Sequence, residues 1–294
     1  MVKRIFICLS VITIFSSCQP WTSVPVPAYI QIGNYTTKVG SLQGTVNQNF
    51  TDMQVIANGQ NYGIYPLGSK IPVVGSGSLD FTIKAVVEIN GVSALRSTYE
   101  VMKGNDTIIN VKQGQVTNII PVFKYFSAAT FPWILSFDAL YNNTGPKLDP
   151  NPSTDTTSHI HYPGMSGKMT DGCLLLRPNS TDNNGVCMLQ TDPAKPIGLP
   201  SGGVGIYLEF NYMGNIPISI AIQGNSSASG LTAITSCGGV YPTATWNKAY
   251  VQLTEQVSTL QSGLYYVYFT CLYDDLVENN AAYIDNIKIV VAHQ

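Results

Sequence analysis

Alternating apolar residues around short turn signals are the feature that most restricts the fold of this chain. TDMQVIANGQNYGIYPL places this alternation on both sides of Asn58-Gly59, and SLDFTIKAVVEINGVSALRSTY repeats it around Asn90-Gly91. Asn-Gly is a dipeptide that tight β-hairpin turns favour. DTIINVKQGQVTNIIPVF predicts two further strands around Gln113-Gly114. Strands at roughly ten-residue spacing, with no helical period, predict a β-sandwich for this part of the chain.

The second half of the chain has the pattern of another all-β unit. Its strand-like segments include VGIYLEFNYMG, ISIAIQG, GLYYVYFTCLY and AYIDNIKIVV. Residues 142–168, by contrast, have almost no apolar period and many turn residues, which predicts a long loop. A unit of roughly 160 residues fits a jelly-roll sandwich of two sheets. We therefore predict an all-β chain, with one sandwich at 28–126, a boundary near 127–130 and a jelly-roll domain at 130–292.

The N-terminal segment MVKRIFICLSVITIFSSC has the features of a secretory leader. Lys3 and Arg4 precede a short apolar run, and two small residues precede Cys18. The run is too short to span a bilayer as a helix. A cysteine directly after small residues resembles a bacterial lipobox, which predicts a signal peptide at 1–17 and acylation of Cys18, for example with palmitate. The alternative is an ordinary cleaved signal that carries a cysteine. Residues 18–27, with three prolines, are then an extended tether.

Charge excludes one class of partner. Without the leader, 13 basic residues stand against 17 acidic ones, a net charge of −4. Nucleic-acid binding needs clustered Lys and Arg, which this chain lacks. Charged residues make up only 11% of the chain, so Tyr, Asn, Thr, Ser and Gly supply most of the polar surface. Such a surface is typical of an extracytoplasmic β-protein.

Four cysteines follow the anchor, all in the second half of the chain: Cys173, Cys187, Cys237 and Cys271. An even set in an oxidising compartment permits disulfides, with three possible connectivities for two bonds. Their apolar neighbours equally favour small, buried core residues. Their spacing matches no zinc motif. The sequence leaves these alternatives open.

Three segments in order, LPSGGVGIYLEFNYMGN, PTATWNKAYVQLTEQV and YIDNIKIV, resemble a family of Bacteroidetes lipoproteins. The resemblance covers most of the chain, including GIYPLGSKIPV and NGVSALRSTYEV in the first half. It implies an N-terminal immunoglobulin- or prealbumin-like sandwich, followed by a jelly roll similar to carbohydrate-binding modules. It also implies lipid anchoring at the outer membrane, with the periplasmic or cell-surface face left open.

The jelly-roll resemblance suggests a structural calcium ion held by Asp138 and Asp285, which lie in its first and last strands. Calcium takes six to eight oxygen ligands, so carboxylates at strand ends suit it. Alternatively, Asp285 and Asn286 only accept backbone hydrogen bonds at a turn. Glu209 is a weaker third candidate, because strand alternation sets it opposite Leu208 and Phe210 and predicts that it faces solvent.

Aromatic side chains on loops are the remaining candidates for ligand binding, since loops on a rigid sandwich carry function. The predicted ligand-binding residues are Tyr141, Tyr162, Tyr241 and Tyr273. No carboxylate pair, nucleophile elbow or phosphate loop stands out, and His159 with His161 lacks a third metal ligand. We therefore predict a non-catalytic protein whose partner is polysaccharide. The alternatives are an accessory lipoprotein docked on an outer-membrane protein complex and, more weakly supported, a polysaccharide-acting enzyme.

Overall fold

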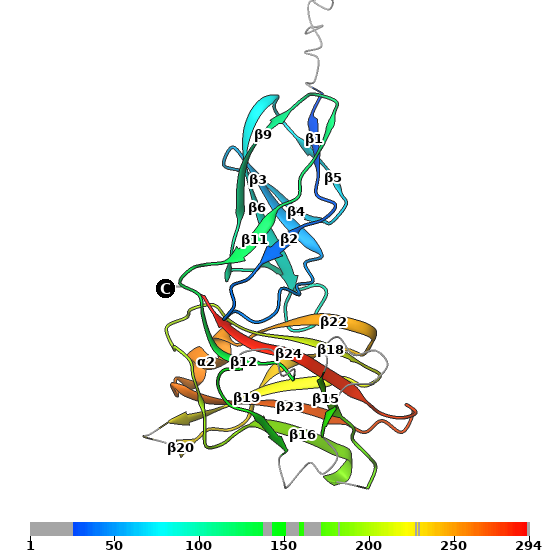
Figure 1. The fold of residues 1–294 in the computed structure, drawn as a ribbon, viewed down its shortest axis with the longest axis vertical. Helices are drawn as coiled ribbons and strands as arrows, with labels where there is room; N and C mark the ends of the chain where they lie inside the picture. The colour runs from blue at the N-terminus through cyan, green and yellow to red at the C-terminus, as the bar shows by residue number, and fades with distance from the viewer. Residues whose placement is uncertain are drawn as a thin grey trace, which may run out of the picture.

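The computed structural model is built almost entirely of β-strands, arranged as two sandwiches stacked end to end (Figure 1). It describes residues 26–137, 143–150, 159–161, 172–181, 183–226, 228 and 230–292. Cys18, Asp138, Tyr141 and Tyr162 lie outside the described residues. No described helix is both long and apolar enough to span a bilayer. The prediction of an all-β fold with a jelly roll in the second half is confirmed.

The first sandwich packs one larger sheet against two small ones. The larger sheet has the order β4-β3-β6-β7, with β9 also on β6, and the small sheets have the orders β10-β1-β5 and β2-β11-β8. Their buried residues form one core around Phe50, Phe81 and Phe123. The strands are β1 Ala28–Gln31, β2 Thr36–Lys38, β3 Asp52–Ala57, β4 Gln60–Pro66, β5 Lys70–Val73, β6 Gly77–Glu88, β7 Arg96–Thr98, β8 Met102–Lys103, β9 Asn105–Val111, β10 Val116–Asn118 and β11 Val122–Tyr125.

The jelly roll consists of two facing sheets with a core around Trp133, Phe210 and Phe269. One sheet has the order β14-β15-β24-β18-β22, with β12 on β24; the other has the order β13-β16-β23-β19-β20, with β17 on β23 and β21 on β19. The elements are β12 Thr130–Leu135, β13 Leu148–Pro150, β14 His159–His161, β15 Cys173–Leu176, the 3₁₀ helix η1 Asn183–Gly185, β16 Val186–Thr191, β17 Ile197–Gly198, β18 Ile206–Gly214, β19 Ile218–Ser226, β20 Gly230–Leu231, β21 Thr235–Val240, β22 Thr243–Gln252, α2 Thr254–Leu260, β23 Leu264–Leu272 and β24 Ala282–Val291.

The Asn-Gly turns form where the sequence predicts them. Asn58 and Gly59 have φ values of 47° and 78° and join β3 to β4, and Asn90 and Gly91 follow β6 with φ values of 56° and 68°. Two consecutive positive φ values are the mark of a type I′ hairpin turn. The two strands predicted around Gln113-Gly114 also form, as β9 and β10, but they do not pair with each other. β9 joins β6, whereas β10 lies parallel to β1 in another sheet.

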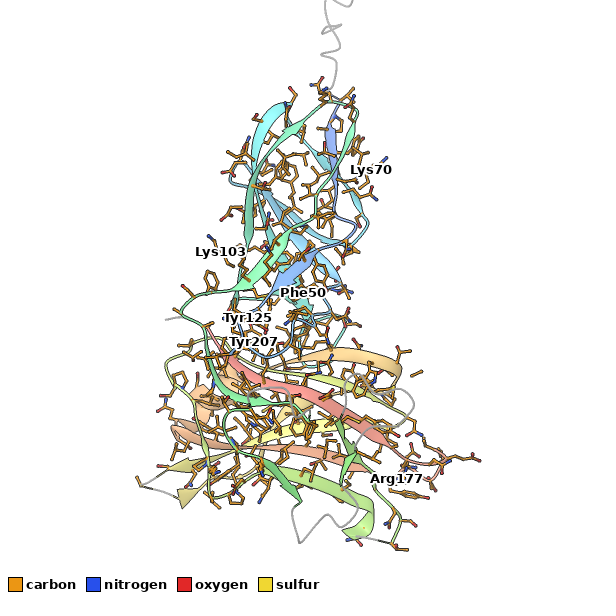
Figure 2. The ribbon with its side chains drawn as sticks, in the orientation of Figure 1. Phe50, Lys70, Lys103, Tyr125, Arg177 and Tyr207 are labelled. Carbon is orange, nitrogen blue, oxygen red and sulfur yellow. The ribbon has the colours of Figure 1, made fainter. Side chains whose placement is uncertain are left out.

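The two sandwiches meet across the outer face of the β24-β18-β22 sheet. Tyr207, Tyr250 and Val290 on that face are buried in the core of the first sandwich, not in that of the jelly roll. Figure 2 shows Tyr125 and Tyr207 close to this junction. The loop after β6 docks along the outer edge of β22, where Ile89 forms a parallel bridge with Tyr250 and the Asn90 amide donates to the Tyr250 carbonyl oxygen (2.9 Å).

Glu209 lies on this covered face and is fully buried. The prediction that it faces solvent is therefore wrong. Strand alternation does point its side chain away from the jelly-roll core. However, the first sandwich, and not solvent, covers that face of the sheet.

Candidate functional site

An open groove of about 540 Å³ lies at the loop end of the jelly roll, away from the first sandwich. Two loops form it, one after β15 and one between β23 and β24. Figure 2 shows Arg177, from the first of these loops, at that end. The lining residues are Arg177, Pro178, Asn179, Tyr273, Asp275, Val277, Glu278, Asn279 and Asn280.

Two asparagine side chains, those of the buried Asn280 and the exposed Asn215, hold the second loop in shape. The Asn280 Oδ1 accepts a hydrogen bond from the Asp274 amide (2.7 Å), while its Nδ2 donates to the carbonyl oxygens of Asp274 (2.9 Å) and Val277 (2.6 Å). Asn215 reaches across from the turn after β18 and donates to the Glu278 carbonyl oxygen (3.0 Å). Asn280 is only 4% exposed. The groove wall is thus preorganised, which lowers the entropy lost on binding.

Tyr273 is the aromatic residue of this groove. Its side chain is 40% exposed, whereas its backbone amide donates to the Gly185 carbonyl oxygen (2.8 Å) and so fixes its position. Around it lie a guanidinium, two exposed carboxylates and amide groups. A flat apolar ring next to hydrogen-bonding groups suits a ligand that has both apolar faces and hydroxyls.

Of the other predicted tyrosines that the structure describes, Tyr241 is 75% exposed but does not line the groove. It follows β21, whose last residue, Val240, pairs with Ile218. The next residue of β19, Ser219, pairs with Thr270 near the end of β23. Tyr241 and Tyr273 therefore project from the same end of the jelly roll, on strands separated by β19.

The calcium prediction stays a prediction, because only one of its two residues is described. Asp285 is fully buried, and its two oxygens accept hydrogen bonds from the Asn286 amide (2.7 Å) and from the Asn286 Nδ2 (3.2 Å). These contacts match the alternative in which Asp285 serves as a local acceptor. Within the described part of the chain, no three His, Cys, Asp or Glu side chains lie close enough to hold a metal ion.

The junction between the sandwiches holds a second cluster of polar groups, centred on Glu209. Its Oε2 lies 3.0 Å from the Lys248 Nζ and 3.5 Å from the Lys288 Nζ. Its Oε1 accepts hydrogen bonds from the hydroxyls of Tyr99 and Tyr125, the latter at 2.7 Å. Both tyrosines belong to the first sandwich, whereas the carboxylate and both lysines belong to the jelly roll.

The pKa values of this cluster reflect its burial and pairing. Burial alone would raise the pKa of Glu209, but the two lysines and the two tyrosine hydroxyls outweigh it and lower the pKa to about 2. Burial lowers the pKa of Lys288 to about 8, against the opposing effect of Glu209. The carboxylate is therefore ionised at neutral pH, and the cluster is a charged link inside the molecule.

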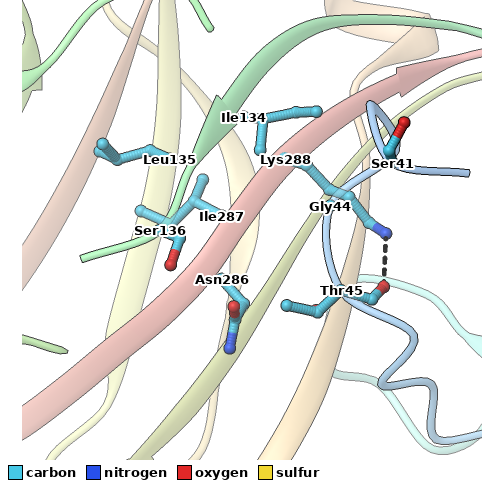
Figure 3. Close-up of a pocket in the computed structure, with 9 residues that line it drawn as sticks. All are labelled: Ser41, Gly44, Thr45, Ile134, Leu135, Ser136, Asn286, Ile287 and Lys288. Atoms are coloured by element: carbon cyan, nitrogen blue, oxygen red, sulfur yellow. Dashed lines mark hydrogen bonds between the residues drawn. The ribbon is translucent and has the colours of Figure 1, made fainter. Parts of the chain in front are cut away.

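The cavities at this junction are too small for a ligand. Figure 3 shows one of about 10 Å³ where Lys288 passes between β12 and the 41–45 loop to reach the Thr45 carbonyl oxygen (3.4 Å). A second, beside Lys248 and Asn247, measures about 60 Å³. A water molecule occupies roughly 30 Å³, so these spaces hold water at most. The groove at Tyr273 is thus the better candidate for a binding site.

Sequence reasoning missed several of these residues. Arg177, Asp275 and Glu278 carry no motif that distinguishes them from other surface residues. At the junction, Glu209 and Lys288 each lie between apolar residues of a strand segment, but so does Lys84, whose side chain is exposed. This pattern therefore does not by itself identify a buried charge.

No family model matches the sequence, and no curated protein matches it. Similar solved structures include a family 29 carbohydrate-binding module in a variant complexed with mannohexaose, at 13% identity and a TM-score of 0.36, over 56% of this chain and 94% of that one. The xylan-binding domain of family 22 from Paenibacillus barcinonensis is 9% identical with a TM-score of 0.36, over 57% and 99%.

A third similar structure is the enzymatically active domain of tailspike protein 4 from bacteriophage CBA120. It is 11% identical with a TM-score of 0.34, over 49% of this chain and only 19% of that one. At these TM-scores the three structures identify no ligand or reaction for this chain.

Proposed function

We propose that this chain is a non-catalytic, lipid-anchored extracytoplasmic protein that binds glycan in the groove at Tyr273. The observation that carries the proposal is the groove itself, in which an exposed tyrosine ring lies among side chains that donate and accept hydrogen bonds. A sugar ring has apolar C–H faces for the aromatic ring and hydroxyls for the amides and carboxylates around it. The loop between β23 and β24 is held by the buried Asn280 before any ligand arrives.

The charges of the groove favour an uncharged glycan. Asp275 and Glu278 contribute two carboxylates, and Arg177 contributes one guanidinium. An anionic polymer would meet a net negative lining and a protein of net negative charge, which disfavours its approach.

Glycan arrays and affinity gels with the unlipidated chain test the proposal. Replacing Tyr273 with Ala should weaken binding about tenfold or more, equivalent to roughly 1.4 kcal/mol, because the ring contact is lost. Tyr273→Phe should retain most of the binding. Tyr241→Ala is the matched control, since it removes an exposed tyrosine at the same end but outside the groove.

Three results would contradict this assignment. Binding that depends on Tyr241 and not on Tyr273 would place the site elsewhere. No binding to any polysaccharide would remove the glycan function. Release of new reducing ends from a bound polysaccharide would show that the protein is an enzyme.

The lipid anchor is proposed from the leader sequence alone. The first described residues lead into β1 at the far end of the first sandwich, and the groove lies at the opposite end of the molecule (Figures 1 and 2). An anchor at Cys18 would therefore present the groove away from the membrane. Cys18→Ser should move the protein to the soluble fraction or leave the leader uncut. Labelled palmitate in the membrane-bound Cys18→Ser chain would disprove the anchor.

A second candidate function is docking on an outer-membrane protein complex. It is favoured by two leucines beside the groove, since Leu272 is 60% exposed and Leu276 is 90% exposed. Isolated exposed leucines are common, but one at the end of β23 and another on the loop that follows, both near an exposed tyrosine, suit a protein contact. Cross-linking in membranes, with Leu276→Asp as the variant, tests it. Recovery of a monomer without partners would exclude this function.

A further inference from the structure

Cys187 and Cys271 lie directly opposite each other on the neighbouring antiparallel strands β16 and β23. Both side chains belong to the core between the two sheets, and each is only 1% exposed. Residues opposite each other in an antiparallel pair have Cα atoms about 4.5–5.5 Å apart. This separation falls within the range of roughly 4.4–6.8 Å that disulfides require. The pair thus has the register and the side-chain direction for a disulfide.

The two remaining cysteines have no such geometry. Cys237 lies on β21, and β19 runs between β21 and β23. Strands two positions apart are separated by roughly 10 Å, beyond the reach of a disulfide. Burial also raises the pKa of the Cys237 thiol to about 12, so its reactive thiolate form is scarce.

Cys173 belongs to the other sheet, on β15. Its neighbour Leu174 points into the jelly-roll core, whereas Cys173 is not part of that core. Because successive side chains of a strand point to opposite faces, Cys173 faces away from Cys187 and Cys271. Of the possible pairings that the sequence left open, the geometry favours a single one.

We propose that Cys187 and Cys271 are a disulfide-forming pair that covalently joins β16 to β23 beneath the groove. The structure holds both residues as thiols, and the disulfide is the oxidised form of the pair. The oxidant is a disulfide compound, such as a thiol–disulfide exchange protein. One thiolate attacks its S–S bond to give a mixed disulfide, and the second thiolate displaces the remaining thiol. The chain loses two protons and two electrons, and the oxidant leaves as two thiols.

Burial determines when this bond forms. Once the jelly roll is folded, neither sulfur is accessible to an oxidant, so the exchange takes place while β16 and β23 are pairing. The closed core then shields the bond from reductants, as expected of a structural disulfide. The bond closes a loop of roughly eighty residues, a length at which a cross-link restricts the unfolded chain strongly.

The position of the pair connects it to the groove. Cys271 precedes Tyr273 by two residues, and Cys187 follows Gly185, whose carbonyl oxygen accepts the hydrogen bond from the Tyr273 amide. A bond between the two strands at this level fixes the base of the loop that carries the tyrosine.

Mass spectrometry on the refolded full chain tests the proposal. The chain is denatured, refolded with oxidised and reduced glutathione, denatured again without reductant so that every remaining thiol is accessible, blocked with iodoacetamide, and digested. The expected result is a peptide pair linked through Cys187 and Cys271 that separates on reduction, with Cys173 and Cys237 alkylated. Alkylation of Cys187 and Cys271 without reduction, or a link through either of the other two cysteines, would overturn it.

Matched variants separate the bond from general packing effects. Refolding in reductant, in place of the glutathione mixture, should lower the melting temperature of the wild-type chain and of Cys237→Ala by several degrees. It should have no effect on Cys187→Ala combined with Cys271→Ala. An equal response in this double variant would contradict the proposal. The mass measurement on the wild-type chain remains decisive if the double variant does not fold.

Discussion

Glu209 illustrates how a fully buried charge can be tolerated when its partners are polar and close. Desolvation of a carboxylate is expensive, and only close partners of opposite charge offset it. Glu209 has two lysine partners and two tyrosine hydroxyls, so its acceptor positions are occupied. Since the partners come from both sandwiches, the same contacts that keep Glu209 ionised also join the two halves of the molecule.

Replacing Glu209 with Gln should lower the free energy of unfolding by about 3–5 kcal/mol, the usual effect of breaking a buried ion pair. The amide leaves Lys248 and Lys288 buried without a counter-charge. Urea denaturation of both chains measures the difference. Glu278→Gln, at an exposed carboxylate, is the control and should change stability by less than roughly 0.5 kcal/mol. Equal stability of Glu209→Gln and wild type would show that the cluster is not a net stabilising link.

Glu209 also predicts an acid-sensitive stability. Its folded-state pKa of about 2 lies below the unfolded value of 4.5, so its contribution is fully present above pH 4.5 and is lost as the pH falls towards 2. The shift corresponds to about 3 kcal/mol of stability. Unfolding measured between pH 2 and 5 should show this loss in the wild type and much less of it in Glu209→Gln. Identical pH profiles would contradict the assignment.

At the scale of single elements, hairpins could be predicted where the turn residues impose the backbone. Asn58-Gly59 and Asn90-Gly91 set positive φ values, and both turns form. Gln113-Gly114 also turns the chain, with Gly114 at a φ of 71°, but its flanking strands pair elsewhere. Turn chemistry is local, whereas the partner of a strand depends on contacts with distant segments. The sequence pattern therefore located strands better than it located their neighbours.

The two Asn-Gly turns provide a matched pair of substitutions. A Cβ at Gly91 would lie 2.3 Å from the Gly239 carbonyl oxygen in the jelly roll, whereas a Cβ at Gly59 has nothing within 4 Å. Both Ala variants lose the ease with which glycine adopts positive φ, at about 1–2 kcal/mol. Gly91→Ala should lose more stability than Gly59→Ala, because the clash forces the docked loop off the jelly roll. Equal melting temperatures for the two variants would disprove the tight contact.

At the scale of the whole molecule, the β24-β18-β22 sheet contributes to two cores, one on each of its faces. Tyr207, Tyr250 and Val290 are on jelly-roll strands but are buried in the first sandwich. Neither the pairing of the sandwiches nor the burial of Glu209 could be predicted, because alternation says which face a residue is on and not what covers that face. The candidate site was predicted in part. Tyr273 was predicted as an exposed loop aromatic. Arg177 and the two carboxylates were not, because they lie far apart in the sequence and only the fold brings them to the same groove.

Because one sheet contributes to both cores, we expect the two sandwiches to unfold together. Calorimetry of the wild-type chain should show one transition whose calorimetric and van't Hoff enthalpies agree. Glu209→Gln and Gly91→Ala should each broaden it or split it in two, whereas Gly59→Ala should leave a single transition. Two separate transitions in the wild type would mean that the junction couples the sandwiches only weakly.

The docked loop at Gly91 and the charged cluster at Glu209 brace the junction at two separate places, so bending there would have to break both. The two sandwiches then behave as one rigid unit and not as two domains that move independently. The proposed anchor would hold this rigid unit by the end of the first sandwich that lies farthest from the groove. The rigid unit would fix the distance between its anchored end and the groove. The first sandwich would therefore serve as a spacer, and its length would set how far from the anchored end the groove can meet a glycan.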